Sequence, residues 1–175
     1  MAVHALDLAE WKMENAQAEY ESAKNIDIEI TRIPADDTQK KDLFITSAVS
    51  GFLASGRSPI LLKVLAQAAT RRPDTRLYIA RIDGEVAGTA ALAFFSTPFG
   101  RVAELYLDST LPAYQGRGVQ SALLRARLDV AKSEGCGTAV VTARPGSGSA
   151  RNAVRVGFGL VYTRETFTKT VTTSL

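Results

Sequence analysis

The chain has 175 residues, of which 46% are hydrophobic and 22% charged, with a formal net charge of +3. This length favours one domain, and the composition excludes a wholly disordered chain, a collagen-like chain and a coiled-coil rod. The lone cysteine, Cys136, cannot form an internal disulfide, which favours a reducing compartment. His4 is the only histidine, and no zinc-binding spacing occurs, so we expect no metal site.

The mild positive charge is spread along the chain, so we expect no nucleic-acid partner. Arginines do crowd the C-terminal half, which keeps a small nucleic-acid-binding protein open as a distant alternative. No apolar run approaches the roughly 20 residues that span a bilayer, and the N-terminus lacks the pattern of a secretory signal. We therefore expect a cytoplasmic protein without a membrane partner.

The first third of the chain predicts helices around one strand. Residues 3–24 look helical, so we expect an N-terminal helical extension over 1–24, a possible homodimer arm, before one domain over 25–175. Isoleucines alternate with acids over 26–33, which predicts a strand. A helix then begins at Asp36–Asp37, and a second follows Ser58 and Pro59 and stops near residue 73.

The middle of the chain predicts a meander of three strands. Residues 76–82 and 85–95 flank the pair Asp83–Gly84, which favours a hairpin turn. A second turn at 97–100 leads into a strand over 102–107.

The last third alternates helices and strands. A helix follows the glycine-rich loop at 115–120, and its spacing predicts that Arg125 and Arg127 fall on the solvated side. A buried strand over 138–142, a short helix ending at Gly157–Phe158 and a strand over 160–170 complete the chain. The order indicates an α/β (α+β) fold with a single mixed, mostly antiparallel sheet flanked by helices.

The stretch from Leu105 to Leu124 carries the most functional information, because a strand enters a glycine-rich loop that opens a helix. Free N–H groups of a first helical turn and the helix dipole attract anions, and pyrophosphate would fit such a cradle. A glycine-rich turn that only packs helix on strand is an equally open reading. The loop is neither a Walker A motif nor a dinucleotide fingerprint.

At these residues the chain resembles the GCN5-related N-acetyltransferase superfamily, whose Gln/Arg-x-x-Gly-x-Gly/Ala loop binds acyl-CoA. Residues 115–120 match that loop except for Gln120, which stands where the family has a small residue. Ser149-Ala150-Arg151-Asn152 and Gly157-Phe158 resemble a signature of one bacterial branch. The resemblance covers about residues 26–170.

The resemblance implies splayed fourth and fifth strands, with pantetheine of acetyl-CoA between them. The fourth strand would be Val102 to Asp108, and backbone groups at its exit would bind pantetheine and the thioester carbonyl. The residues implied in acyl-CoA binding are Asp108, Ser109, Thr110, Gln115, Gly116, Arg117, Gly118, Val119, Gln120, Ser121, Ser149 and Asn152. Ser149 and Asn152 could equally cap the short helix.

The implied reaction is direct attack of a primary amine on acetyl-CoA in a ternary complex. Glu104 lies at the offset of a catalytic glutamate in the histone-acetylating branch and is the candidate base, against the reading of a solvated strand residue. The tyrosine that often protonates the thiolate is replaced by Ala153, so Tyr106 and Tyr162 are candidate substitutes. We expect Cys136 to be a small core residue and not a nucleophile.

The resemblance leaves the acceptor open, as a small molecule or a peptide. The acceptor region implied by the family holds no acidic cluster beyond Asp36, Asp37 and Asp42, so a polycationic aminoglycoside is not favoured. The alternative from another class is a non-catalytic CoA-binding sensor or scaffold module, which the missing tyrosine and Gln120 keep open.

Overall fold

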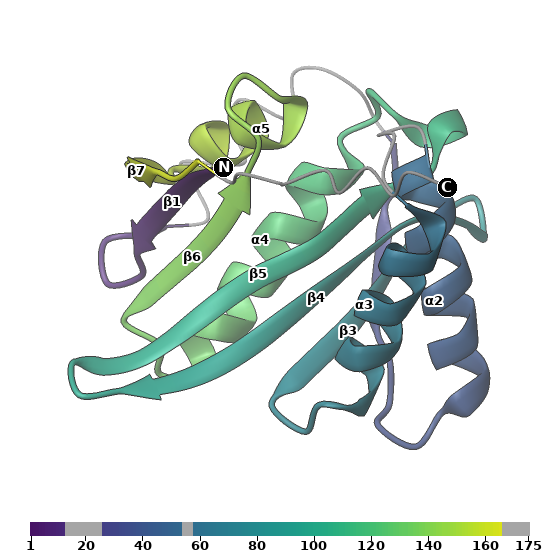
Figure 1. The fold of residues 1–175 in the computed structure, drawn as a ribbon, viewed down its shortest axis with the longest axis horizontal. Helices are drawn as coiled ribbons and strands as arrows, with labels where there is room; N and C mark the ends of the chain where they lie inside the picture. Colours follow the sequence, from purple (N-terminus) through teal and green to yellow (C-terminus); the bar gives the residue numbers. More distant parts are fainter. Residues whose placement is uncertain (13–25, 54–57, 166–175) are drawn as a thin grey trace, which may run out of the picture.

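The fold is built on one seven-stranded sheet, in a computed structural model that describes residues 1–12, 26–53 and 58–165 (Figure 1). The strands lie in the order β2-β3-β4-β5-β6-β1-β7. The β5–β6 pair is parallel and the other neighbours are antiparallel, so the expected mixed, mostly antiparallel sheet is confirmed. The bounds, in chain order, are β1 Ala2–Asp7, β2 Glu29–Arg32, α2 Thr38–Leu53, α3 Pro59–Arg71, β3 Thr75–Ile82, β4 Glu85–Thr97, β5 Gly100–Thr110, the 3₁₀ turn η1 Pro112–Tyr114, α4 Val119–Ser133, β6 Thr138–Ala143, α5 Gly148–Val156 and β7 Gly159–Thr163.

Helices cover both faces of the sheet. On one face, α4 and α5 close a core that includes Leu92, Leu105 and Leu128. On the other face, α2 and α3 close a second core around Phe44 and Leu77. None of the helices in the described ranges is long and apolar enough to cross a membrane.

The N-terminal segment corrects the sequence prediction, because residues 2–7 form a strand and not a helix. β1 pairs with β6 on one side and with β7 on the other, so its backbone groups are satisfied by distant segments. Val3 and His4 are buried, and a short strand inside a sheet does not show the alternation of an exposed one. Residues 13–24 of the predicted helix lie outside the described residues.

The other expected elements are confirmed within a few residues. Pro59 begins α3 after Ser58, as predicted, although the Ser58 side chain makes no capping hydrogen bond. The final strand, expected over 160–170, ends at Thr163 in the described range, and residues 166–170 lie outside that range.

Close packing at Gly88 holds β4 against β5 and the start of α4. A Cβ placed on Gly88 would lie 2.6 Å from the Ser109 carbonyl oxygen and 2.8 Å from Val119 Cγ1. Both distances are shorter than van der Waals contact, and the first involves backbone that cannot turn aside. The sheet and the first turn of α4 therefore depend on the absence of a side chain here.

We expect Gly88→Ala to lower the free energy of unfolding by about 1–3 kcal/mol through overpacking. Urea denaturation measures the loss. Gly137→Ala is the matched control, because Gly137 is exposed and has no atom within 4 Å of a Cβ. Equal stability of the two variants would contradict the packing argument.

Candidate functional site

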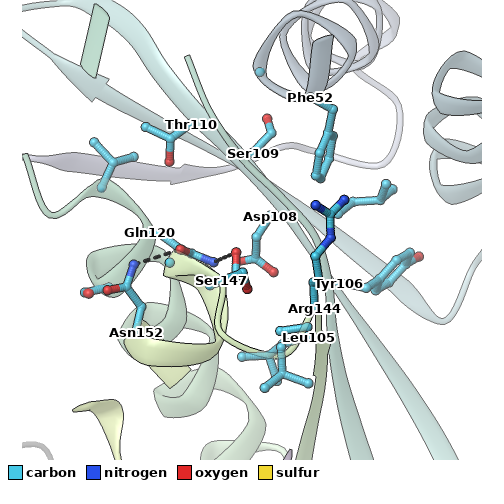
Figure 2. A pocket seen from close by; sticks show the side chains of 18 of the residues that line it. Phe52, Leu105, Tyr106, Asp108, Ser109, Thr110, Gln120, Arg144, Ser147 and Asn152 are labelled. Carbon is cyan, nitrogen blue, oxygen red and sulfur yellow. Dashed lines mark hydrogen bonds between the residues drawn. The ribbon is translucent and has the colours of Figure 1, made fainter. Parts of the chain in front are cut away.

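A cavity of about 970 Å³ opens where β5 and β6 separate (Figure 2). The parallel pairing runs from Val102–Thr138 to Leu105–Val141 and then stops, although β5 continues to Thr110. The expected splay between these two strands is therefore present. Beyond Leu105 the edge of β5 that faces β6 makes no ladder, which leaves backbone groups available to a ligand.

A bulge in β5 follows directly after the last pair with β6. The register of β5 against β4 shifts between Thr89 and Ala91, where β5 holds one extra residue. Leu107 has a φ of 52°, which a leucine seldom adopts. Bulges bend a strand and re-aim its side chains. This bulge lies in the wall of the cavity, since Leu107 and Asp108 both line it.

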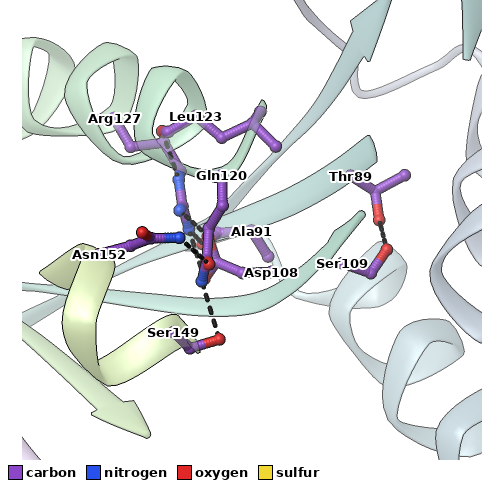
Figure 3. Close-up of polar contacts among 9 residues, drawn as sticks. All are labelled: Thr89, Ala91, Asp108, Ser109, Gln120, Leu123, Arg127, Ser149 and Asn152. Carbon is purple, nitrogen blue, oxygen red and sulfur yellow. Dashed lines mark hydrogen bonds and ion pairs between the residues drawn. The ribbon is translucent and has the colours of Figure 1, made fainter. Parts of the chain in front are cut away.

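A buried arginine from the middle of α4 holds the bulge (Figure 3). Arg127 forms an ion pair with Asp108, with side chains 0% and 8% exposed. Arg127 Nη1 also donates to the Ala91 carbonyl at 2.8 Å, and Nε donates to the Leu123 carbonyl at 2.9 Å. Burial raises the pKa of Asp108, and the charge and hydrogen bonds of Arg127 oppose that rise.

The expectation that Arg127 lies on the solvated side of its helix is therefore wrong. The spacing of apolar residues predicts which face of α4 is buried, but it contains no information about a bulge in a neighbouring strand. The bulge instead presents the Asp108 carboxylate to Arg127, inside the core. Arg125 is half-buried and lines the cavity.

The loop before α4 forms the second wall of the cavity. Gly116 and Gly118 have φ values of 74° and 84°, and Gly118 is the N-cap of α4. The first turn of α4 carries no acidic residue. The N–H groups and the dipole of this turn therefore give the wall a positive potential that suits an anion.

The side chain of Gln120 joins α4 to α5. It donates to Ser149 Oγ at 3.0 Å and accepts from Asn152 Nδ2 at 2.8 Å. The N-cap of α5 is Ser147, whose hydroxyl accepts from the Ala150 N–H. Ser149 and Asn152 therefore do not cap this helix, and the larger residue at position 120 connects two walls of the cavity.

The structure brings together eleven of the twelve residues expected to bind acyl-CoA, all except Arg117, in the lining of this cavity. The Arg117 guanidinium instead lies over the Tyr114 ring, 5.4 Å from its centre. Glu104 and Tyr106 also line the cavity. Tyr162 lies on β7, is 52% exposed, and does not belong to the lining.

Glu104 and Tyr106 of β5 lie on the face of the sheet that α2 and α3 cover. Tyr106 packs against the core of that face, and its hydroxyl is 3.0 Å from Thr75 Oγ1. Burial raises the pKa of Tyr106, so its hydroxyl stays protonated near neutral pH. Glu104 is half-buried one strand period away.

Residues that sequence reasoning missed complete the lining. Leu65 and Arg144 reach the cavity from α3 and from the residue after β6. No local motif marks them, because α3 and β6 meet only through the sheet. Phe52 of α2 also lines the cavity, whereas Phe44 of the same helix is fully buried in the core.

Cys136 lies in the core and not in the cavity lining, as expected. Burial raises the pKa of its thiol. Within the described ranges, no three His, Cys, Asp or Glu side chains gather as a metal site.

Comparison with known proteins identifies the fold and the family. Residues 44–158 match the model of the acetyltransferase (GNAT) family. No curated protein sequence matches the chain.

Several solved structures share the fold. A predicted acetyltransferase with acetyl-CoA from Clostridium acetobutylicum has a TM-score of 0.62 and 16% identity, over 82% of this chain and 96% of that one. An aminoglycoside acetyltransferase from an uncultured soil metagenomic sample, in complex with sisomicin, has a TM-score of 0.64 and 15% identity, over 83% and 97%. The ribosomal-protein-alanine N-acetyltransferase of Brucella melitensis biovar Abortus 2308 has a TM-score of 0.63 and 16% identity, over 83% and 100%.

We expect Arg127→Met to lower the free energy of unfolding by about 3–5 kcal/mol at neutral pH, because it leaves the Asp108 carboxylate buried without its partner. Removing Arg127 also raises the pKa of Asp108 further. The native variant then binds a proton that the unfolded chain releases near pH 4, so its stability falls as the pH rises towards the raised pKa.

Urea denaturation at pH 5 and pH 8 checks this prediction. The difference in free energy of unfolding between wild type and Arg127→Met should be larger at pH 8 than at pH 5. Adding Asp108→Asn should recover part of the loss. A stability difference that changes neither with pH nor with the second substitution would contradict the ion-pair argument.

Proposed function

The chain belongs to the acetyltransferase (GNAT) family, and on that premise we propose that it is an N-acetyltransferase. It transfers acetyl from acetyl-CoA to a primary amine of a small molecule or a peptide. The amine attacks directly in a ternary complex, with no acyl-enzyme. Burial of Cys136 away from the cavity supports this last point.

The cavity between β5 and β6 is the observation that carries the proposal. It joins the glycine loop before α4 to the unpaired edge of β5 beyond Leu105. The loop suits a pyrophosphate, and the strand edge suits the amide groups of a pantetheine arm. An extended thioester therefore fits between the strands, and acetyl-CoA supplies the activated acetyl group.

The bulge in β5 supports stabilisation of the developing oxyanion. Leu107 and Asp108 line the cavity, and their backbone lies outside the β5–β6 ladder. A fixed N–H donor aimed at an oxyanion needs no reorganisation during the reaction. The Arg127–Asp108 pair holds that backbone rigid from behind.

Glu104 and Tyr106 are the proposed proton carriers. An amine is mostly protonated near neutral pH and must lose a proton before it attacks. Glu104, a half-buried carboxylate in the lining, accepts that proton directly or through water. Tyr106 keeps its proton near neutral pH and can return one to the leaving thiolate. The exposed position of Tyr162 on β7 favours Tyr106 for this role.

Acetyl-CoA should raise the melting temperature of the protein, whereas ATP at equal concentration should not. A ligand at 100 times its dissociation constant adds about 2.7 kcal/mol of stability. A thermal-shift series with acetyl-CoA, longer acyl-CoAs, CoA and ATP measures the effect. The absence of any shift with CoA compounds would contradict the proposal.

Three variants test the proton carriers. We expect Glu104→Gln and Tyr106→Phe each to lower kcat about 100-fold, because each removes a proton-transfer group. Tyr162→Phe should retain wild-type kcat. Steady-state release of the CoA thiol measures these rates, and the KM for acetyl-CoA should not change.

The same assay separates an enzyme from a CoA-binding sensor or scaffold module. A sensor would bind acetyl-CoA but would acetylate no amine. Unchanged kcat in Glu104→Gln across the pH range would remove Glu104 as the base.

A further inference from the structure

Arg144 is a cation of the cavity that the proposed chemistry does not use. It follows the last residue of β6, is exposed, and lines the cavity. Its carbonyl accepts from the Ser147 N–H, but its guanidinium forms no hydrogen bond or ion pair with any residue in the described ranges. An arginine that lines a ligand cavity without a partner is available to an anionic group of that ligand.

The alternation of side chains along β6 places Arg144 on the side of the sheet away from the glycine loop before α4. Ala139 and Val141 face the core under α4, so Val140 and Thr142 face the opposite side. Arg144 continues this second series. Figure 2 shows its guanidinium directed towards Phe52 beside Tyr106, away from Gln120 and Asn152.

Arg144 and the β5 bulge both lie beyond the point where β5 and β6 stop pairing. Leu105 and Val141 form the last pair of the two strands, and Asp108 and Arg144 each lie three residues further along the chain. Arg144 therefore lines the same cavity as the segment whose backbone is proposed to hold the thioester carbonyl, so an anion bound by Arg144 would lie near the attacking amine.

The part of the cavity on the α2 and α3 side of the sheet holds few charged groups. Glu104 is its one carboxylate within the described ranges, since the Asp108 carboxylate is paired with Arg127 behind the wall. Phe52 and Leu65 add apolar surface. An acceptor with several ammonium groups would meet one carboxylate and an opposing guanidinium. An acceptor with one amine, an adjacent carboxylate and an apolar part would find a partner for each.

We propose that the acceptor is a free α-amino acid with an apolar side chain, and that Arg144 binds its carboxylate. This inference rests on the proposed acetyl transfer. The α-amine loses its proton towards Glu104 and forms a bond to the acetyl carbon. The carbon–sulfur bond breaks, the thiolate is protonated, and the products are an N-acetyl amino acid and CoA.

An acceptor panel tests the substrate class. Leucine, methionine and phenylalanine are compared with their carboxamides, with an alanine-terminated peptide and with sisomicin, at fixed acetyl-CoA. Thiol release is measured, and products are identified by mass spectrometry. We expect kcat/KM for the free amino acids to exceed that for the carboxamides about tenfold or more, since a hydrogen-bonded charge pair is lost.

Arg144 variants test the contact. Arg144→Gln should raise the KM for leucine about tenfold or more and leave the KM for acetyl-CoA and the slow rate with leucinamide unchanged. Arg144→Lys should recover part of the loss. Arg71→Gln is the matched control, because Arg71 is an exposed arginine at the end of α3 outside the cavity lining.

Each contrary result identifies what failed. Equal rates with amino acids and carboxamides, or preference for the peptide or sisomicin, would overturn the amino-acid proposal while leaving acetyl transfer intact. A higher KM for acetyl-CoA in Arg144→Gln would assign Arg144 to the CoA site. If no amine is acetylated, the proposed function fails. In that case, titration of N-acetyl-leucine into wild type and Arg144→Gln tests the carboxylate site. Equal affinities would overturn the proposal that Arg144 binds the carboxylate.

Discussion

The buried Arg127–Asp108 pair determines the shape of the cavity. Placing an arginine at 0% exposure is expensive unless all its strong donors are used, and Arg127 directs them to the Asp108 carboxylate and to two carbonyls. These contacts join the middle of α4 to β4 and to the bulge of β5. The bulge begins where β5 leaves β6, so a core interaction sets the geometry of an edge that lines the cavity.

The two faces of the sheet present different chemical groups to the cavity. On the α4 face, the glycine loop and the helix N-terminus favour an anion, and Gln120 joins this wall to α5. On the α2 and α3 face, Glu104, Tyr106 and Arg144 surround the proposed acceptor site. The opening between β5 and β6 connects the two sides. In the proposed reaction, the thioester binds on one side and meets the amine from the other.

The glycine loop was recognisable from the sequence because its constraint is local. Gly116 and Gly118 adopt positive φ values, and a helix must begin directly after them, so the motif survives in a single stretch. Glu104 could be proposed because the resemblance implies a catalytic glutamate at its offset from the glycine loop, and Tyr106 because it lies close to the same pattern. The pairing of Tyr106 with Thr75, by contrast, joins residues 31 positions apart and has no signal in either segment.

Periodicity and turn residues by themselves determined β2 to β7, the four helices α2 to α5 and the loop that opens α4, since each depends on neighbours in the chain. Only the tertiary structure decided the rest. Residues 2–7 became a strand because β6 and β7 both offered unpaired edges. Arg127 entered the core because a bulge in β5 presented a carboxylate, and Arg144 joined the cavity because two strands diverged. These outcomes depend on contacts between segments far apart in sequence, where local pattern carries no information.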